Sequence, residues 1–347
     1  DGSAELYLDP AKVTDELPAH LGNEVTLLPE SSVMTTLQEL GEKKARIALD
    51  PEITPLAFAL ALESSGAEIK EMQDPCALPR ATKNAAELDG SRQAHIRDGA
   101  VITKFLHWLA IEAPKGKLTE IKAAQKLEAL RVETGVLKDI SFDTISGAGP
   151  HGALPHYRVS TKSDIAIENG TLFLIDSGGQ YEDGTTDITR TMAIGTPTEE
   201  MKRCYTLVLK GHIALATARF PKGTTGHALD AFARRPLWEA GLDYDHGTGH
   251  GVGSYLGVHE GPQRIAKQPN SQPLLPGMIC SNEPGYYKAG EFGIRIENLI
   301  IVTAPAPVDG GEREMMSFET ITLAPLEREL IVKDMLTREE ISWVNAY

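Results

Sequence analysis

The stretch of residues 172–191 constrains the fold more than any other part of this sequence. An apolar run over residues 172–175 predicts a buried strand, and the run ends in Asp176. A turn rich in Gly and Asp follows, and then a second run, rich in Thr and Ile, with a preference for β-structure. The pattern predicts a β-hairpin with its midpoint at residues 181–182, which places Asp176 directly opposite Asp187.

Two aspartates opposite each other in a hairpin predict a metal site. Cross-strand neighbours have Cβ atoms only about 5 Å apart. At that distance two carboxylates repel, so at least one takes up a proton unless a cation lies between them. The alternative is that one of the two is an ordinary turn residue beside Gly.

Composition limits the classes of partner and the compartment. The 347 residues are 41% hydrophobic, which suits two globular domains. Lys and Arg total 34 against 49 Asp and Glu, and the sequence has no basic run, which argues against nucleic acid or an anionic membrane as a partner. The three cysteines form no CxxC motif, and we find no signal peptide or long apolar span. We therefore expect a cytoplasmic protein.

Residues 1–80 are predicted to form a small layered α/β domain, because strand and helix patterns alternate there. Gly41 and Gly66 are placed as helix C-caps. This segment contains no group of catalytic residue types. The predicted strands are 5–8, 25–28, 46–49 and 68–72, and the predicted helices are 31–40 and 55–64.

A second domain is predicted over residues 81–347, after a linker at residues 75–83. Asn84 with Glu87 three residues later forms a capping-box pattern, which predicts the start of a helix reaching residue 112. Further helices are predicted at 119–134, 198–220 and 226–241, with strands and glycine-rich loops around them. Because strand-like and helical patterns run close to the two ends, we expect a piece of a longer protein.

Three of the ten histidines lie between His246 and His259, in a stretch dense with Gly. Glycine allows the backbone to approach a ligand closely, and neutral His is the commonest metal ligand. A single His of this kind is more often structural. Three of them together, following the aspartate hairpin, favour a site for metal binding and proton transfer.

Two glutamates in strand-like runs extend this candidate site. With a period of two, Gly293, Arg295 and Glu297 share one face of a strand. A Glu directed into a buried layer is costly unless it is paired or binds a metal. Arg295 is either the ion-pair partner of Glu297 or a group that orients a ligating carboxylate. Glu283 has no cation beside it in the sequence, which favours a ligand role.

The chemistry of the combined set is that of a two-metal hydrolase. Four carboxylates are balanced by two divalent ions, with room for a bridging hydroxide. Oxygen ligands with one imidazole favour Mn, Co, Fe or Zn over a thiolate site. Paired ions of this kind activate water and polarise a carbonyl. The candidate ligands are Asp176, Asp187, His250, Glu283 and Glu297.

These motifs resemble the metallopeptidase family with the pita-bread fold, which contains methionine aminopeptidases, prolidases, aminopeptidase P and creatinase. The resemblance extends from about residue 82 onward, and within the family it is strongest to the cytosolic type of Xaa-Pro aminopeptidase. It implies an α/β (α+β) protein, with a creatinase-like domain before the catalytic domain. The motifs are the aspartate hairpin, His-Gly-Thr-Gly-His-Gly-Val-Gly with His-Glu-Gly-Pro after it, Asn-Glu-Pro-Gly-Tyr-Tyr and Gly-Ile-Arg-Ile-Glu-Asn.

The resemblance also implies roles for individual residues. Asp176 would bind one ion alone, Asp187 and Glu297 would bridge two divalent ions, usually Mn2+, and His250 and Glu283 would complete their shells. Glu283 would also be the general base. The family's non-ligand histidines, which bind substrate and assist proton transfer, correspond to His156, His246 and His259. A homodimer is implied as well.

The function implied is that of a metal-dependent aminopeptidase, which releases the N-terminal residue from peptides with proline in second position by means of a hydroxide bridging the two ions. One alternative is a prolidase, which cuts Xaa-Pro dipeptides. Another is a metal-free peptide- or partner-binding module on the same fold. Three-domain relatives carry a further amino-terminal domain that this sequence does not show, so the preferred substrate length stays open.

Overall fold

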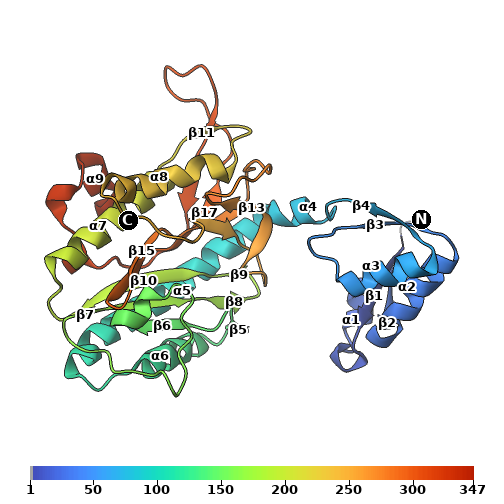
Figure 1. Ribbon diagram of the computed structural model, residues 1–347, viewed down its shortest axis with the longest axis horizontal. Helices are drawn as coiled ribbons and strands as arrows, with labels where there is room; N and C mark the ends of the chain where they lie inside the picture. The colour runs from blue at the N-terminus through green and yellow to red at the C-terminus, as the bar shows by residue number, and fades with distance from the viewer. Residues whose placement is uncertain (1–2) are drawn as a thin grey trace. The chain divides into compact units, whose positions relative to one another are not determined.

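The computed structural model describes residues 3–347, and the chain divides into two compact units after Ala77. Figure 1 shows the elements of each unit. The predicted boundary between residues 80 and 81 stays a prediction. The first two residues of the predicted first domain lie outside the described residues.

The first unit alternates strands with helices, as the α/β pattern predicts. Its strands form two parallel pairs, β1 (Ala4–Leu8) with β2 (Val25–Pro29) and β3 (Arg46–Leu49) with β4 (Glu68–Glu71). Its helices are α1 (Leu17–Leu21), α2 (Val33–Glu42) and α3 (Leu56–Ser65). The sequence pattern did not predict α1, which is only five residues long.

The prediction for Gly66 is confirmed and the prediction for Gly41 is wrong. Gly66 is the C-cap of α3 and has a left-handed φ of 104°. Gly41 instead lies inside α2, where a Cβ would collide with Ser65 at the end of α3. The two helices pack closely at this point, so Gly41 is required by packing and not by the end of a helix.

The predicted linker contains a short helix, α4 (Ala77–Ala81), and the long helix α5 (Ala85–Glu112) follows it. The capping box of α5 forms as predicted: the Asn84 side chain accepts from the backbone N–H of Glu87 at 3.0 Å, and the Glu87 carboxylate accepts from that of Asn84 at 2.8 Å. Two glycines that weaken this helix in isolation, Gly90 and Gly99, lie where a Cβ would collide with neighbouring backbone.

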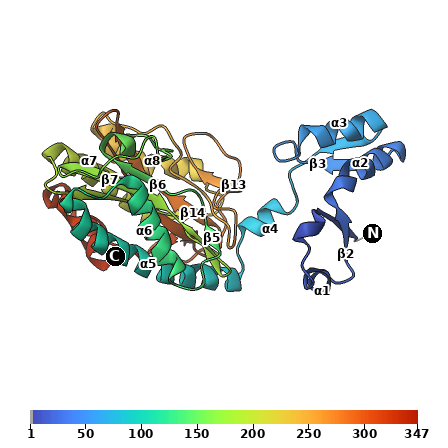
Figure 2. The same ribbon diagram turned by 90° about the horizontal axis from the view of Figure 1, so that it is seen from below.

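In the second unit, strands lie between helices of residues 85–132 on one side and helices of residues 199–239 on the other (Figures 1 and 2). Its helices are α5, α6 (Glu120–Val132), α7 (Glu199–Ala216), α8 (Gly226–Glu239) and α9 (Arg338–Ala346). Its strands are β5 (Asp139–Ile140), β6 (Ile145–Ala148), β7 (Thr171–Ser177), β8 (Gly179–Tyr181), β9 (Gly184–Thr185), β10 (Ile188–Ile194), β11 (Phe220–Pro221), β12 (Gly249–Gly251), β13 (Glu260–Ile265), β14 (Ile279–Asn282), β15 (Gly285–Lys288), β16 (Phe292–Arg295), β17 (Asn298–Val302), β18 (Met315–Met316) and β19 (Phe318–Thr320).

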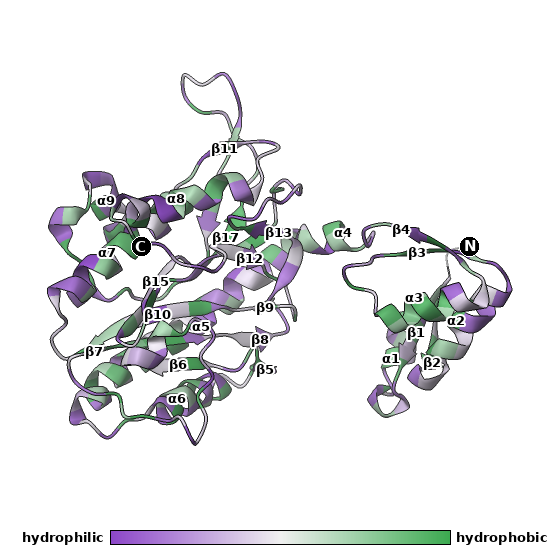
Figure 3. Cartoon of the chain, in the orientation of Figure 1, coloured by the Kyte–Doolittle hydropathy of each residue, from purple (hydrophilic) through white to green (hydrophobic). Residues whose placement is uncertain are grey.

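Two antiparallel sheets form the centre of this unit. One has the strand order β10-β7-β6, and the other has the order β13-β12-β14-β17-β19. Apolar side chains of α5 and α6 pack against β7 and β10 in one core, and those of α7 pack against β16 in another. Figure 3 shows apolar colour along β7, the middle strand of its sheet. The ends of these strands carry the candidate site residues.

The register predicted for the hairpin is wrong by two residues. Asp176 on β7 lies opposite Thr189 on β10, not opposite Asp187. The reason is the position of the turn: Tyr181 pairs with Gly184, which centres the turn one residue later than predicted. A shift of two residues preserves the face of the strand, so Asp176 and Asp187 still project toward the same side.

The state of the cysteines and the composition of the helices can both be described for residues 3–347. Cys76 is exposed, Cys204 and Cys280 are buried, and all three are free thiols. Within residues 3–347, no helix combines the length and the apolar composition that crossing a bilayer requires.

Candidate active site

A cavity of about 460 Å³ in the second unit brings the predicted site residues together. It is lined by acidic side chains, by the apolar residues Phe142, Ile145 and Pro155, and by two arginines, Arg158 and Arg264. Every residue predicted for the site lines this cavity: Asp176, Asp187, His250, Glu283 and Glu297, together with His156, His246, His259 and Arg295.

Asp176 is the penultimate residue of the central strand β7, and it is held by Arg295. The Nη2 atom of Arg295 donates to Asp176 Oδ2 at 2.6 Å. Oδ1 of Asp176 is buried and has no partner among the described residues. Of the two alternatives left open by the sequence, an ion pair with Glu297 or the orientation of a ligating carboxylate, the ion pair with Glu297 does not form, and Arg295 pairs with Asp176. One carboxylate oxygen is left directed into a polar site without a donor.

Asp187 and His250 meet across two sheets. Asp187 immediately precedes β10 and is 3% exposed. His250 lies on β12, and its Nε2 atom is 3.5 Å from Asp187 Oδ2. The other ring nitrogen, Nδ1, donates to the carbonyl of Gly251 at 2.9 Å. This hydrogen bond fixes the tautomer in which Nε2 faces the carboxylates, which is the arrangement typical of a metal-binding His.

Glu283 follows the last residue of β14. Its backbone N–H donates to the carbonyl of Thr248 at 2.8 Å, and its Oε1 atom accepts from Ser281 Oγ at 3.0 Å. The same Oε1 lies 3.5 Å from His250 Nε2. Both the main chain and the side chain of Glu283 are thus held in place beside His250.

Glu297 lies between β16 and β17 and is 2% exposed. Its Oε2 atom accepts from Thr189 Oγ1 at 2.7 Å, and its carbonyl accepts from the guanidinium of Arg190 at 2.8 Å. The predicted alternation is visible here: Arg295 and Glu297 face the cavity, while Ile294 and Ile296 lie in the apolar core. The alternation follows from the strand period of two.

The electrostatics of this cluster are those of a site with too few cations. Burial, with the charges of neighbouring carboxylates, raises the pKa of Asp187 to about 6 and that of Glu297 well above its usual range. Burial likewise raises the pKa of Glu283 to about 7, although His250 and Arg295 oppose the shift. Burial disfavours the charged form of His250, but Asp187 and Glu283 outweigh it and raise that pKa to about 9.

The donor set fits divalent metal ions. Single ligand atoms from Asp187, His250 and Glu297 all lie within 4.8 Å of one another. Oδ1 of Asp176 is buried without a partner, and raised carboxylate pKa values show that negative charge is under-compensated. Hard oxygen donors with one imidazole are the ligands that Mn2+, Co2+, Fe2+ or Zn2+ accept.

A chain of hydrogen bonds links the metal-site carboxylates to His246 through a residue that the sequence analysis did not single out, Tyr287. Arg295 Nη1 donates to the Tyr287 hydroxyl at 2.7 Å, and that hydroxyl lies 2.8 Å from His246 Nε2. His246 Nδ1 donates to the carbonyl of Gly247 at 2.7 Å, so Nε2 accepts from Tyr287. Burial, with the charge of Arg295, lowers the pKa of His246 to about 3.

Tyr287 could have been found from the alternation of β15. It lies two residues after Gly285 and four after Glu283 in the Asn-Glu-Pro-Gly-Tyr-Tyr motif, on a strand paired with the one that carries Arg295. In this motif, only Glu283 is predicted from the sequence to be a site residue.

His156 and His259 are exposed, in contrast to His246. The ring of His259 packs edge-on against that of His250, with centroids 4.4 Å apart. Burial of part of its ring, with the charge of His250, lowers the pKa of His259. Their exposure on the cavity wall leaves both rings accessible to a peptide.

Three protein-family models match parts of this chain. Residues 89–304 match the metallopeptidase family M24, residues 1–87 match the creatinase/prolidase N-terminal domain, and residues 314–347 match the C-terminal region of the same peptidase family. The chain belongs to metallopeptidase family M24. The predictions of this family and of the pita-bread fold after a creatinase-type domain are confirmed.

Individual M24 relatives are similar over nearly the whole chain. The chain is 46% identical over 99% of its length to a probable Xaa-Pro aminopeptidase P of Aspergillus fumigatus, and 45% identical, again over 99%, to that of Paracoccidioides brasiliensis. It covers 54% and 58% of those proteins, so the chain spans about half the length of the curated relatives it matches.

Solved M24 structures give the same picture. An X-prolyl aminopeptidase of Caenorhabditis elegans, described as a cytosolic enzyme with a di-nuclear active site, superposes with a TM-score of 0.91 at 38% identity. That match covers 99% of this chain and 57% of the other. A prolidase of Pyrococcus furiosus superposes with a TM-score of 0.73 at 26% identity, over 93% and 88% of the two chains.

Proposed function

We propose that this chain is the catalytic part of a metal-dependent Xaa-Pro aminopeptidase, which releases the N-terminal residue of peptides with proline in second position. The observation that carries the proposal is the convergence of Asp176, Asp187, His250, Glu283 and Glu297 on one cavity. Similarity to Xaa-Pro aminopeptidases over 99% of the chain supports the choice within the family.

The five residues are proposed to hold two divalent ions, with Mn2+ as the first choice and Co2+, Zn2+ or Fe2+ as alternatives. In this proposal Asp187, His250 and Glu297, whose ligand atoms lie close together, would hold the ions together with Asp176 and Glu283. Bound ions would supply Lewis-acid polarisation of the scissile carbonyl and activation of water.

Glu283 is proposed as the general base and acid. Ser281 occupies its Oε1, which leaves Oε2 as the atom that takes a proton from the attacking water. The leaving group is the proline nitrogen, which needs a proton as the bond breaks, and Glu283 can return it.

The three non-ligand histidines divide into two kinds. We propose that His156 and His259, whose rings are exposed on the cavity, bind the peptide and assist proton transfer. His246 has both ring nitrogens engaged and stays neutral because burial lowers its pKa to about 3. It is proposed to act by holding Tyr287 and thereby Arg295. A cytoplasmic location and a homodimer are part of the same proposal.

The test compares an Xaa-Pro-Xaa tripeptide with an Xaa-Pro dipeptide on metal-stripped protein, with and without added Mn2+. Cleavage of the tripeptide that depends on Mn2+ supports the proposal. Preference for the dipeptide would move the function to a prolidase, a second candidate favoured by the likeness to the Pyrococcus furiosus enzyme. No bound divalent ion, and no cleavage of either peptide after Mn2+ is added, would favour the metal-free binding module.

A further inference from the structure

A second buried carboxylate, Glu120, lies outside the metal cluster. It is the first residue of α6 and is 0% exposed. Its Oε1 atom accepts from the backbone N–H of Ala148 at 2.8 Å and from His151 Nδ1 at 2.9 Å. Its Oε2 atom accepts from the hydroxyl of Tyr157 at 3.0 Å. The backbone N–H of Ile165 also donates to Oε2 at 3.4 Å, so a single carboxylate accepts from four donors.

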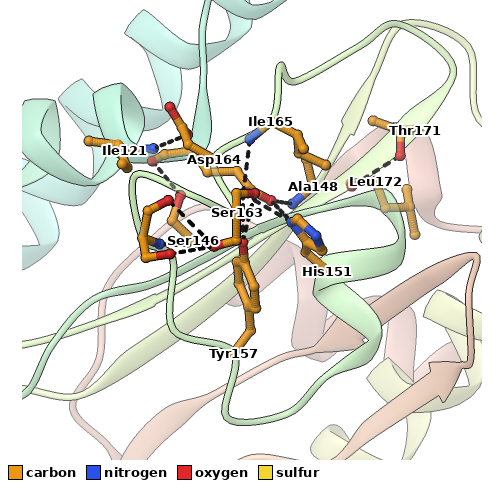
Figure 4. A network of polar contacts seen from close by, with 12 residues as sticks. Ile121, Ser146, Ala148, His151, Tyr157, Ser163, Asp164, Ile165, Thr171 and Leu172 are labelled. Atoms are coloured by element: carbon orange, nitrogen blue, oxygen red, sulfur yellow. Dashed lines mark hydrogen bonds and ion pairs between the residues drawn. The ribbon is translucent and has the colours of Figure 1, made fainter.

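The main chain of Glu120 contacts the same region. Its carbonyl accepts from Ser146 Oγ at 2.8 Å, and its N–H donates to the carbonyl of Ile165 at 3.2 Å. Asp164 caps the same helix end, because its Oδ1 accepts from the N–H of Ile121 at 3.0 Å. Figure 4 shows these partners around the start of α6.

Two of these donors, His151 and Tyr157, lie in a loop formed by residues 149–164. The loop follows β6 and ends beside the start of α6. We call it the His156 loop. Its middle carries Pro155 and His156, which line the cavity. Leu154, His156 and Arg158 are exposed, so Tyr157 is the buried side chain that anchors this part of the loop. Its hydroxyl bonds to Glu120 and also lies 3.0 Å from Ser163 Oγ.

A carboxylate suits this position because several hydrogen-bond donors converge on it. A buried ionised group is costly unless several donors surround it, and hydrogen bonds to an ionised acceptor are stronger than neutral ones. The amide groups at the start of α6 favour negative charge there. The rings of His151 and Tyr157 are stacked, with centroids 4.4 Å apart, so both donors are held in place for the two oxygens.

We propose that Glu120 is a positioning residue for His156. By holding Ala148, His151 and Tyr157, it fixes the backbone on both sides of His156 and keeps that ring at the cavity wall. This inference rests on the proposed function, in which His156 contacts the peptide. It assigns a role to a residue that does not line the cavity.

A double-mutant cycle tests the coupling. Tyr157→Phe removes the hydroxyl that contacts Glu120 and Ser163, and His156→Ala removes the positioned ring. We expect Tyr157→Phe to lower kcat/KM for the tripeptide about tenfold, and to have less than about a twofold effect in the His156→Ala background. Metal content should not change in any of the variants. Independent effects that multiply in the double variant would overturn the proposal.

Hydrogen exchange of the His156 loop tests the same idea without activity. Glu120→Gln and Tyr157→Phe should each increase exchange of residues 149–164. The matched control is Thr119→Ala, which removes the N-cap of the same helix but none of the contacts to the loop. Unchanged exchange in both loop variants, or the same increase in the control, would overturn the proposal.

The two measurements separate this inference from the proposed function. If the wild-type protein is active and the effects of Tyr157→Phe and His156→Ala multiply, the role of Glu120 is contradicted while the proposed function stands. Wild-type protein that cleaves no proline peptide contradicts the proposed function, and the exchange measurement then still decides whether Glu120 holds the loop.

Discussion

Asp98 and the carboxylates of the candidate metal site, all in the second unit, differ in how their charge is balanced. The Asp98 carboxylate, on α5, accepts hydrogen bonds from Arg131 Nε at 2.8 Å and Nη2 at 3.0 Å. It also accepts from the hydroxyls of Tyr181 at 2.8 Å and Thr186 at 2.9 Å. Burial alone would raise the pKa of Asp98, but Arg131 and these hydrogen bonds hold it below its usual range. In the candidate metal site, burial and neighbouring carboxylates instead raise the pKa of Asp187, Glu283 and Glu297.

The difference teaches how a structural carboxylate can be distinguished from a ligand. Asp98 is 2% exposed, and Asp176, Asp187 and Glu297 are 7%, 3% and 2% exposed, so burial does not separate them. The structural one has its full set of donors from the protein. The cluster has Arg295 and His250 against four carboxylates, and Asp176 retains an oxygen without a partner. Such a deficit is a mark of a functional site.

The largest expected effect separates the two groups by activity. Glu283→Gln should lower kcat for the tripeptide by about 10³-fold, because the proton acceptor is lost. The free energy of unfolding of the metal-free protein should not fall, since a buried charge is removed. The same change at an exposed glutamate, Glu128→Gln, is the control and should leave kcat unaltered. Retained activity in Glu283→Gln would exclude it as the base.

The next effect separates them by stability. Asp98→Ala should lower the free energy of unfolding by about 3–5 kcal/mol, because Arg131 is left buried without a counter-charge. Asp187→Asn, measured in chelator, should cause no comparable loss. Urea denaturation of both variants checks this contrast, and equal losses would remove the distinction drawn between the two groups.

The pH dependence of stability should reveal the deficit in the metal-free protein. A carboxyl whose folded-state pKa is raised stabilises the fold below its unfolded pKa, and this contribution is lost as pH rises through the folded value. For Asp187, a rise from 3.8 to about 6 by burial corresponds to about 3 kcal/mol.

With chelator present, Tm should therefore fall as pH rises from about 5 to 8. His250, with its pKa raised to about 9 against the opposing effect of burial, acts in the same direction. Added Mn2+ should reverse the trend, because ligands must lose protons to bind it. Thermal unfolding at several pH values, with and without metal, measures both. A chelated protein that gains stability toward pH 8 would contradict the raised pKa values.

The smallest effect concerns the hydrogen-bond chain behind the cluster. Tyr287→Phe removes the hydroxyl between Arg295 and His246, and should lower kcat/KM about tenfold through misorientation of Arg295 and Asp176. Tyr286→Phe is a matched control on the next residue of β15, where the side chain packs against Phe292. Equal effects in the two variants would argue against a specific role for Tyr287.

Local features of the fold could be predicted well from the sequence. The capping box at Asn84 and Glu87 fixes the start of α5 because all its atoms lie within four residues. Features set by distant contacts could not. Gly41 looks like a helix end until Ser65 packs against it, and the short helix α4 lies in a stretch whose prolines suggested a linker.

The candidate site shows the same division. Residue types and alternation placed Arg295 and Glu297 on one face, because the period of a strand is local. The hairpin register was missed by two residues because the exact centre of the turn depends on pairing between β8 and β9. The partner of Arg295 was open in the sequence, and it proved to be Asp176, 119 positions away.

The sequence by itself determined the chemical inventory of this protein: acidic and imidazole groups at strand ends and in a glycine-rich loop, and the family to which these motifs belong. Only the tertiary structure decided which of those groups are neutralised. It gave Asp98 an arginine, left Asp176 with an unpartnered oxygen, and placed Tyr287 between Arg295 and His246. The reason is that the strength of a charge interaction depends on distance and burial, which residues far apart in the chain acquire only on folding.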